Sequence, residues 1–396
     1  METGSQSSSA DLSDDLIMEI LTLLPPESIV RFRCVSKSWC DLIDLNFLKL
    51  LVTKKEPVNH QDYSVELKSL IESDEDAVDY MYPFQNPCGD GSIEIVGSCN
   101  GLICACHAGC VFYVWNPYTA EYKVILSMES PLGFLTKDSN RRMGYGCSDI
   151  NIGYGFGYDS KSCSYKFVSI FSEPDTDLSE VQMYRLGSGL WKSFDSCIAY
   201  QFSREEPGVF LDGALHWLVS SHMGNDESQP RVLISMDMED GVFKEIAQPE
   251  HMDDFDYTFV GGLRGCLCLL CSVSNAKFEI WQMKDYGVGE SWSKVFKTDY
   301  AELMTMGIRS FRYIRRLVSL RNGEIFFEAC DQHGVVDVVR THLDEKERCQ
   351  NSGGGYKYMK NILQMEAYVA SLVSVKSGTF VGDELKNYPR RLRRPG

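Results

Sequence analysis

The first fifty residues place their apolar side chains at helical spacing. Ser13 can cap a first helix, and Asp14 and Asp15 add negative charge to its first turn, where the helix dipole favours it. Pro25 and Pro26 end this helix and can open another. The apolar positions form a wide stripe along the helix and are Leu12, Leu16, Ile17, Ile20, Leu21 and Leu24.

Two further short helices are predicted before residue 44. One contains Ile29 and Phe32, and the other, which Ser36 can cap, contains Trp39 and Leu42. Three short helices within about 40 residues cannot bury this much apolar surface among themselves, because a domain of that size is only marginally stable. We therefore expect part of the apolar face to bind another chain.

The pattern changes to period two after a charged segment at 51–90, which we interpret as a connector. Short apolar runs then alternate with glycine, asparagine, aspartate and serine turns as far as about residue 345. Glycines that precede an apolar run recur about every 50 to 60 residues, and these are Gly101, Gly157, Gly213, Gly265 and Gly323. This period predicts propeller blades of kelch length.

Five repeats are visible, and a sixth is predicted if 92–96 pairs with 368–375 and closes the ring. Closure would protect the sheet edges. The chain has no Trp-Asp dipeptide, which argues against a WD-type propeller. The C-terminal segment 377–396 is rich in arginine, which is more typical of a flexible solvated tail than of a nuclear import signal.

The charge balance excludes several classes of partner. The 396 residues contain 39 lysines and arginines against 56 aspartates and glutamates, a formal net charge of −17. Such a chain is not expected to bind nucleic acid or an anionic membrane. No apolar stretch approaches the roughly 20 residues that cross a bilayer, and the first residues do not form a secretory signal. We expect a cytoplasmic or nuclear protein whose 15 cysteines are reduced.

Some motifs suggest chemistry, but each has a structural interpretation that we favour. Residues 97–101 (Gly-Ser-Cys-Asn-Gly) resemble a nucleophile elbow, yet a strand follows where a helix is required. Cys268 and Cys271 have zinc or redox spacing without a second pair at finger distance. The glycines within 153–157 do not match the phosphate-binding pattern, and His216 lies in an apolar run typical of a core. We predict no catalytic residue, no metal site and no cofactor.

The helical module matches one known pattern at several points. A Leu-Pro pair follows the first helix at 24–25, an Arg-Phe-Arg-x-Val-x-Lys-x-Trp stretch spans 31–39, and Leu-Ile follows at 42–43. In these features the module resembles an F-box, although Ser13 stands where that family usually has proline. The resemblance implies docking onto the Skp-family adaptor of a cullin-based ubiquitin ligase. The alternative is a helical hairpin that packs only on its own chain. The residues that we assign to adaptor binding are Leu12, Leu16, Ile20, Leu24, Pro25, Ile29, Phe32, Val35 and Trp39.

The strand repeats also match a known domain. Its marks are Trp-Asn-Pro-x-Thr at 115–119, Phe-Gly-Tyr-Asp-Ser at 156–160, Gly-Ala-Leu-His-Trp-Leu at 213–218, a Trp-to-Trp stretch at 281–292, and the segment 368–374. Here the chain resembles the F-box-associated domain of plant F-box proteins, nearest to S-locus F-box proteins and related constitutive-defence regulators.

The predicted fold is therefore an N-terminal three-helix F-box (all-α) followed by an all-β, kelch-like propeller of five to six blades. The expected boundaries are 10–50 for the F-box, 51–90 for the connector, 91–376 for the propeller and 377–396 for the tail. The resemblance implies a non-catalytic receptor that presents a protein client for ubiquitination and proteasomal degradation, with the cullin reached through the adaptor.

The client is the least determined part of this interpretation. The S-locus resemblance implies a self-incompatibility ribonuclease, and the alternative is an immune receptor whose degradation represses defence signalling. A glycan-binding or hydrolytic propeller remains as an alternative of another class. We expect the client on the polar loops 127–148, 172–180, 201–208 and 220–229. Acidic side chains would attract a basic client, and the candidates are Asp237, Glu239, Asp240, Asp253, Asp254 and Asp256.

Overall fold

A computed structural model provides the three-dimensional structure. The residues that it describes are 13–22, 32, 39, 42–43, 48–55, 63–69, 78–81, 93–107, 111–126, 151–172, 179–196, 200–203, 206–220, 231–305, 308–319, 323–333, 336–344, 358–369, 371 and 373–376. The expected tail at 377–396 lies outside them.

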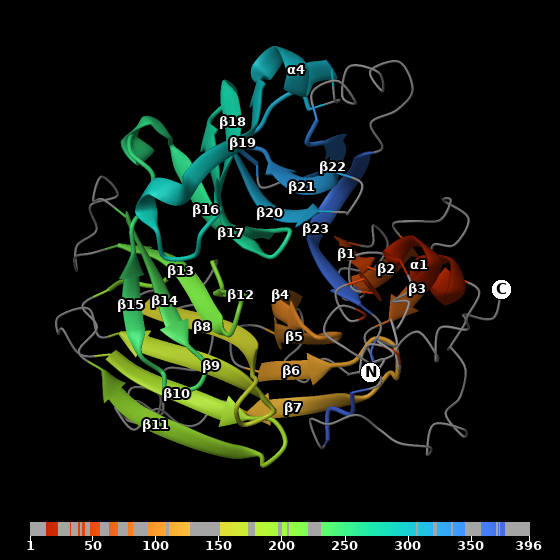
Figure 1. Cartoon of the computed structure of the whole chain (residues 1–396), viewed down its shortest axis with the longest axis vertical. Coiled ribbons are helices and arrows are strands. Elements are labelled where there is room, and N and C mark those ends of the chain that lie inside the picture. The colour runs from red at the N-terminus through yellow and green to blue at the C-terminus, as the bar shows by residue number, and fades with distance from the viewer. Residues whose placement is uncertain are drawn as a thin grey trace, which may run out of the picture.

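Antiparallel sheets stand around a common axis in chain order and form a five-bladed propeller (Figure 1). Each of the first four sheets contains four strands that follow one another in sequence. The first sheet consists of β4 (Ile93–Cys99), β5 (Leu102–His107), β6 (Val111–Trp115) and β7 (Tyr122–Leu126). The second consists of β8 (Asn151–Asp159), β9 (Ser164–Ser172), β10 (Ser179–Arg185) and β11 (Leu190–Ser196). The third consists of β12 (Val209–Leu211), β13 (Ala214–Ser220), β14 (Arg231–Asp237) and β15 (Phe243–Ile246). The fourth consists of β16 (Tyr257–Leu263), β17 (Cys266–Val273), β18 (Lys277–Met283) and β19 (Trp292–Asp299).

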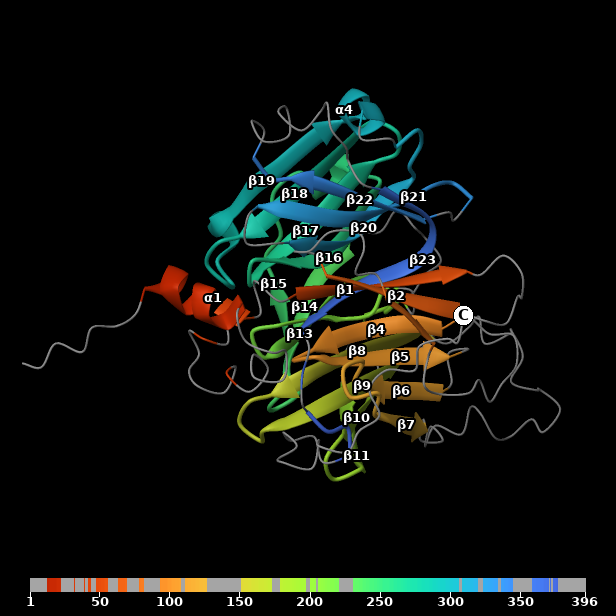
Figure 2. The same ribbon diagram turned by 90° about the vertical axis from the view of Figure 1, so that its right-hand side faces the viewer.

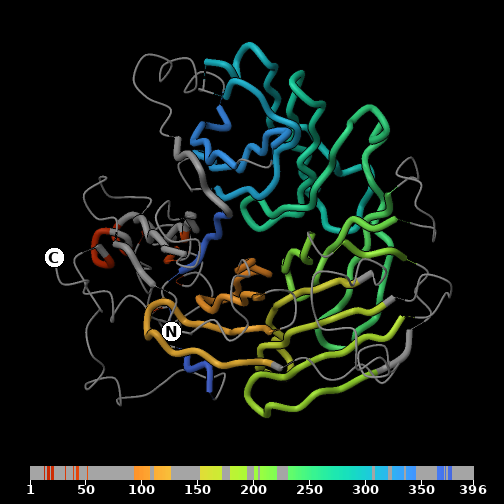
Figure 3. Tube along the Cα trace, turned by 180° about the vertical axis from the view of Figure 1, so that it is seen from behind, coloured from red at the N-terminus to blue at the C-terminus, as the bar shows by residue number. Residues whose placement is uncertain are grey.

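The fifth sheet has seven strands because both ends of the propeller sequence join it. In spatial order its strands are β20 (Tyr313–Ser319), β21 (Glu324–Cys330), β22 (Val336–His342), β23 (Tyr358–Val369), β1 (Leu48–Lys55), β2 (Tyr63–Ser69) and β3 (Val78–Met81). The first part of β23 pairs with β22, and its second part pairs with β1. Strands β1 to β3 therefore extend this sheet beyond β23 (Figure 1), while β23 itself contacts β4 of the first sheet. Figure 3 shows the sheets of the ring from behind.

This closure differs from the expected one in two respects. The segment 51–90, interpreted as a connector, contributes most of β1 and all of β2 and β3. The pairing expected between 92–96 and 368–375 is replaced by pairing of β23 with β1, where Lys49 faces Tyr368. The contact between β23 and β4 is made by a side chain. The amide of Gln364 on β23 donates to the carbonyl of Ile95 on β4 (3.0 Å) and accepts from the N–H of Ile95 (2.6 Å).

Helical structure is sparse in the described part of the chain. Helix α1 spans Asp14–Thr22, and Phe32, Trp39, Leu42 and Ile43 are also helical. The other helical elements are α4 (Tyr300–Thr305) and the short 3-10 turns η2 (Met252–Asp254) and η3 (Gly289–Ser291). The capping role expected of Ser13 is present, because its hydroxyl accepts from the N–H of Leu16 (3.4 Å) and its carbonyl accepts from that of Ile17 (3.0 Å).

The glycine repeat marks the turn between the first two strands of a sheet in all but one case. Both residues of the Asn100-Gly101, Asp212-Gly213 and Arg264-Gly265 turns have positive φ, which suits a two-residue hairpin turn. Gly157 instead lies inside β8, where an added Cβ would approach the ring of Phe210 to 2.3 Å. The run Gly153, Gly155 and Gly157 is thus a packing surface for Phe202 and for side chains of the third sheet.

Apolar clusters fill the gaps between neighbouring sheets. One joins the first and second sheets through Phe112 and Phe156, and others follow between the next sheets around the ring. A further cluster packs Leu51 of β1 and Tyr368 of β23 against Tyr113 of the first sheet. Burial of these faces drives ring formation, because each sheet is covered on both sides only when its neighbours are present.

The propeller has two faces with different connections. The turns between first and second and between third and fourth strands lie at one end of each sheet, which we name the short-turn face. The other turns and the links between sheets lie at the opposite end, the long-connection face. Lys161 and Glu239, from short turns of the second and third sheets, form an ion pair, which confirms that such turns share a face. Helix α1 lies on the short-turn side (Figure 2).

Candidate protein-interaction sites

Helix α1 has two apolar faces with different environments. Ile17 and Leu21 are buried, whereas Leu16 and Ile20 are 49% and 44% exposed. Each pair is separated by four residues, so each forms its own row along the helix. The single wide stripe expected from the sequence therefore divides into a buried row and an exposed row.

The buried row packs partly on the propeller. Ile17 and Leu21 share an apolar cluster with Leu42, Ile43 and Val369, the last residue of β23. Phe32 and Trp39 pack against this cluster with their rings edge to face, and their centroids are 5.5 Å apart. The helical module is thus attached to the closing strand of the ring, and the exposed row remains available to another chain.

The structure describes some of the residues that were assigned to adaptor binding. Leu16 and Ile20 are exposed, while Phe32 and Trp39 are partly buried against their own module. The remaining assigned residues lie outside the described part of the chain, and they are Leu12, Leu24, Pro25, Ile29 and Val35.

The acidic residues proposed for client binding fall on opposite faces of the propeller. Asp237 is the last residue of β14, and Glu239 and Asp240 follow in the turn to β15, on the short-turn face. Asp253, Asp254 and Asp256 belong to the link between β15 and β16, on the long-connection face. They do not form one acidic surface, because β15 lies between the two groups and carries the chain from one face to the other. The four loops expected to bind the client all begin and end at the long-connection face.

Sequence reasoning missed an aromatic side chain beside the first acidic group. Tyr286 lies in the turn between β18 and β19, and its hydroxyl contacts Nε2 of His216 at 2.7 Å. Nδ1 of His216 lies 3.2 Å from the carbonyl of Val209, so Nδ1 carries the donated proton and Nε2 accepts from Tyr286. The signal was an aromatic and an apolar residue, Tyr286 and Val288, within a turn otherwise made of charged residues, glycine and one serine.

The pKa of Tyr286 reports the charge around it. Burial raises this pKa, and the negative charges of Asp212 and Asp237 raise it further. Burial also lowers the pKa of His216 to about 4, so the imidazole is neutral at physiological pH. The pair of rings is therefore a neutral support beneath an acidic surface.

A central cavity lies between the inner strands of the sheets. Its cavity has a volume of about 260 Å³ and includes Phe259, Arg315, Arg316 and Glu366 in its wall. Arg316 donates to Glu366 (3.0 Å) and to the carbonyl of Ile95 (3.0 Å), which ties β20 to β23 and β4. Arg316 and Glu366 of the wall thus contribute to ring closure, whereas Arg315 pairs with Glu328 within the fifth sheet (3.0 Å).

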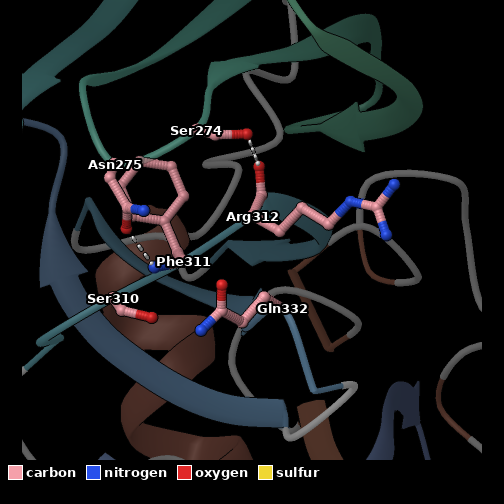
Figure 4. Close-up of a pocket in the computed structure, with 6 residues that line it drawn as sticks. All are labelled: Ser274, Asn275, Ser310, Phe311, Arg312 and Gln332. Atoms are coloured by element: carbon pink, nitrogen blue, oxygen red, sulfur yellow. Dashed lines mark hydrogen bonds between the residues drawn. The ribbon is translucent and has the colours of Figure 1, made fainter.

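A second cavity of about 230 Å³ lies at the junction of the fourth and fifth sheets (Figure 4). The hydroxyl of Ser274 donates to the carbonyl of Arg312 (3.0 Å), and the side-chain oxygen of Asn275 accepts from the N–H of Phe311 (2.8 Å). These bonds hold the two sheets together on the long-connection face. None of the residues predicted for client binding lines this cavity.

The cysteine motif is buried in the fourth sheet. Burial raises the pKa of Cys268 far above its usual range and that of Cys271 to about 12, so both thiols are protonated. Within the described residues, no group of three or more His, Cys, Asp or Glu side chains could hold a metal ion. Nor does any helix in this part of the structure have the length and apolarity to cross a membrane.

Comparison with known proteins agrees with both parts of the architecture. The F-box domain family matches residues 10–51, and the F-box associated beta propeller domain family matches residues 42–375. The chain is similar to the F-box/kelch-repeat protein At3g23880 of Arabidopsis thaliana, with 29% identity over 302 residues, which cover 71% of this chain and 78% of the relative. It is also similar to the F-box protein CPR1 of the same plant, with 28% identity over 343 residues, which cover 78% and 77%. The chain therefore belongs to the F-box proteins that contain an F-box associated beta propeller domain.

Proposed function

We propose that this protein is the substrate-receptor subunit of a ubiquitin ligase of the Skp adaptor, cullin and F-box type. The observation that supports this proposal most is the division of α1. Ile17 and Leu21 hold the helix on its own chain, while Leu16 and Ile20 remain exposed. Two large aliphatic side chains one turn apart on a short helix are a suitable contact for an adaptor groove.

The proposed contribution of the chain is proximity and not catalysis. The helical module binds the adaptor, and the propeller holds a protein client on the same polypeptide. Tethering both partners raises the effective concentration of client lysines near the ubiquitin-loaded enzyme that the cullin recruits. The packing of α1 against Val369 of β23 would fix the direction in which the client is presented.

The adaptor contact can be tested by charge substitution in the exposed row. Ile20→Asp should abolish co-purification of the full chain with a Skp-family adaptor, because a carboxylate cannot be buried without a partner. Leu190→Asp is the matched control, since Leu190 is 68% exposed on β11 of the propeller. Circular dichroism should show both variants folded. Retention of the adaptor by Ile20→Asp would overturn the proposal.

The client is proposed to be a basic protein, because the chain is strongly acidic. The family resemblance implies two candidate clients, a secreted-type ribonuclease and an immune receptor. Expression of this protein in pollen would favour the ribonuclease, and expression in leaf would favour the immune receptor. Affinity purification from the native tissue, followed by mass spectrometry, should recover a basic protein whose binding weakens with salt. Recovery of only acidic partners, insensitive to salt, would contradict a basic client.

A further inference from the structure

Two turns on the short-turn face, one from the third sheet and one from the fourth, expose three large apolar side chains. Val242, Tyr286 and Val288 are each almost half exposed, in turns of the third and fourth sheets. Val242 accepts a backbone hydrogen bond from Asp237 (3.1 Å), and Asp237 is close enough to Tyr286 to raise the pKa of its hydroxyl. We name this surface, formed by Val242, Tyr286 and Val288, the Tyr286 patch.

The Tyr286 patch is held rigidly from below. The hydroxyl of Tyr286 is fixed by Nε2 of His216 (2.7 Å), and the two rings meet edge to face at 5.6 Å. The hydroxyl of Ser291 donates to the carbonyls of Asp285 (2.9 Å) and Val288 (2.7 Å), which closes the turn. A partner that docks here therefore loses little affinity to ordering of the patch.

Carboxylates lie beside the patch, and the charges of Asp212 and Asp237 act on the hydroxyl of Tyr286. Asp212, Asp237, Asp240 and Asp285 form no ion pair with another described residue. Glu239 is paired with Lys161. An incoming cation would thus find both an aromatic ring and unpaired carboxylates within one surface.

We infer that the Tyr286 patch binds a basic segment of the protein client, with an arginine or lysine against Tyr286 and neighbouring apolar side chains on Val242 and Val288. The inference rests on the proposed receptor function and specifies its client surface. Charge complementarity selects this occupant: an acidic or uncharged segment would leave Asp212 and Asp237 uncompensated beside a desolvated contact.

The test uses the full chain and a fluorescein-labelled peptide in which arginine alternates with leucine. A second peptide has citrulline in place of arginine, which removes the charge and keeps the shape. Fluorescence anisotropy should show tighter binding of the arginine peptide. Tyr286→Ala should weaken that binding about two- to fivefold, and Tyr286→Phe should retain it, because the ring supplies the cation contact.

A charge-matched pair of variants separates the patch from general attraction to an acidic protein. Asp212→Asn with Asp237→Asn should weaken binding, since asparagine keeps the positive φ of Asp212 and the capping oxygen of Asp237. Asp253→Asn with Asp254→Asn changes the charge equally on the opposite face and should have no effect. Equal weakening by both pairs, or equal binding of both peptides, would overturn the inference. Adaptor co-purification, measured on the same variants, tests the proposed function separately.

Discussion

The side-chain amide of Asn116 donates to the carbonyl oxygen of Ser371 at 3.0 Å, although 255 residues separate them in sequence. The same nitrogen donates to the carbonyl of Val373 at 2.8 Å. Its side-chain oxygen accepts from the N–H groups of Tyr118 (2.9 Å) and Thr119 (3.3 Å). One buried amide thus binds the C-terminal segment to the first sheet, which explains the Trp-Asn-Pro-x-Thr motif as a closure device.

Replacing Asn116 by aspartate should open this closure. The carboxylate has nearly the same shape but cannot donate to the carbonyls of Ser371 and Val373, and we expect a loss of about 2–4 kcal/mol in the free energy of unfolding. Urea unfolding monitored by tryptophan fluorescence measures the loss. Asn275→Asp, at an exposed turn where the side chain only accepts, should change stability little. Equal stability of the two variants would contradict this role for Asn116.

Substitutions at Gly101 and Gly213 distinguish the cost of disturbing ring closure from the cost of strain in a tight turn. Both have a φ near +85°, but a Cβ at Gly101 would lie 2.2 Å from Cβ of Ser371, whereas one at Gly213 would meet nothing within 4 Å. Gly213→Ala should cost about 1–2 kcal/mol, the strain of a left-handed residue. Gly101→Ala should cost clearly more, because the C-terminal segment must move. Thermal unfolding of the two variants checks the order, and a reversed order would exclude close packing at Gly101.

Local features of the propeller could be predicted because they depend on short stretches of sequence. Period-two alternation and turn glycines located the strand pairs such as β6 with β7 and β14 with β15. The repeat was misaligned only in the second sheet, because Gly157 is required by packing against Phe210 and not by a turn. Sequence spacing alone cannot distinguish these two uses of glycine.

Relationships between distant segments could not be predicted from the sequence. Strands β1 to β3 lie in a charged segment that lacks clear alternation, and pairing with β23 places them in the fifth sheet. The acidic residues near 237 and 253 are close in sequence but lie on opposite faces, because β15 separates them. Tyr286 joined the candidate site only through its contact with His216, 70 residues away.

The contact between Val369 and α1 should stabilise the helical module. Val369→Ala would remove methyl groups from the cluster that contains Ile17 and Leu21, at a cost of about 1–3 kcal/mol. Hydrogen exchange of the amides at 14–22 should become faster. Val336→Ala removes the same atoms from a buried site on β22 and serves as the control. If both variants accelerate exchange in α1 equally, the effect is a general loss of ring stability and the docking contact is excluded.

His216 should make the stability of the propeller depend on pH in a defined window. Burial holds its pKa at about 4 in the folded chain, despite the opposing charge of Asp212, while the unfolded chain has the ordinary value near 6.5. At a pH between these two pKa values, His216 is protonated in the unfolded state and neutral in the folded state. The free energy of unfolding therefore has its full contribution from neutral His216 above pH 6.5. It falls by about 3 kcal/mol in total as the pH drops towards 4. Urea unfolding at pH 7.5, 6.5, 5.5 and 4.5 should show a smaller dependence for His216→Gln, which cannot titrate. Because other groups titrate alike in both proteins, identical slopes would show that His216 does not stay neutral in the folded chain.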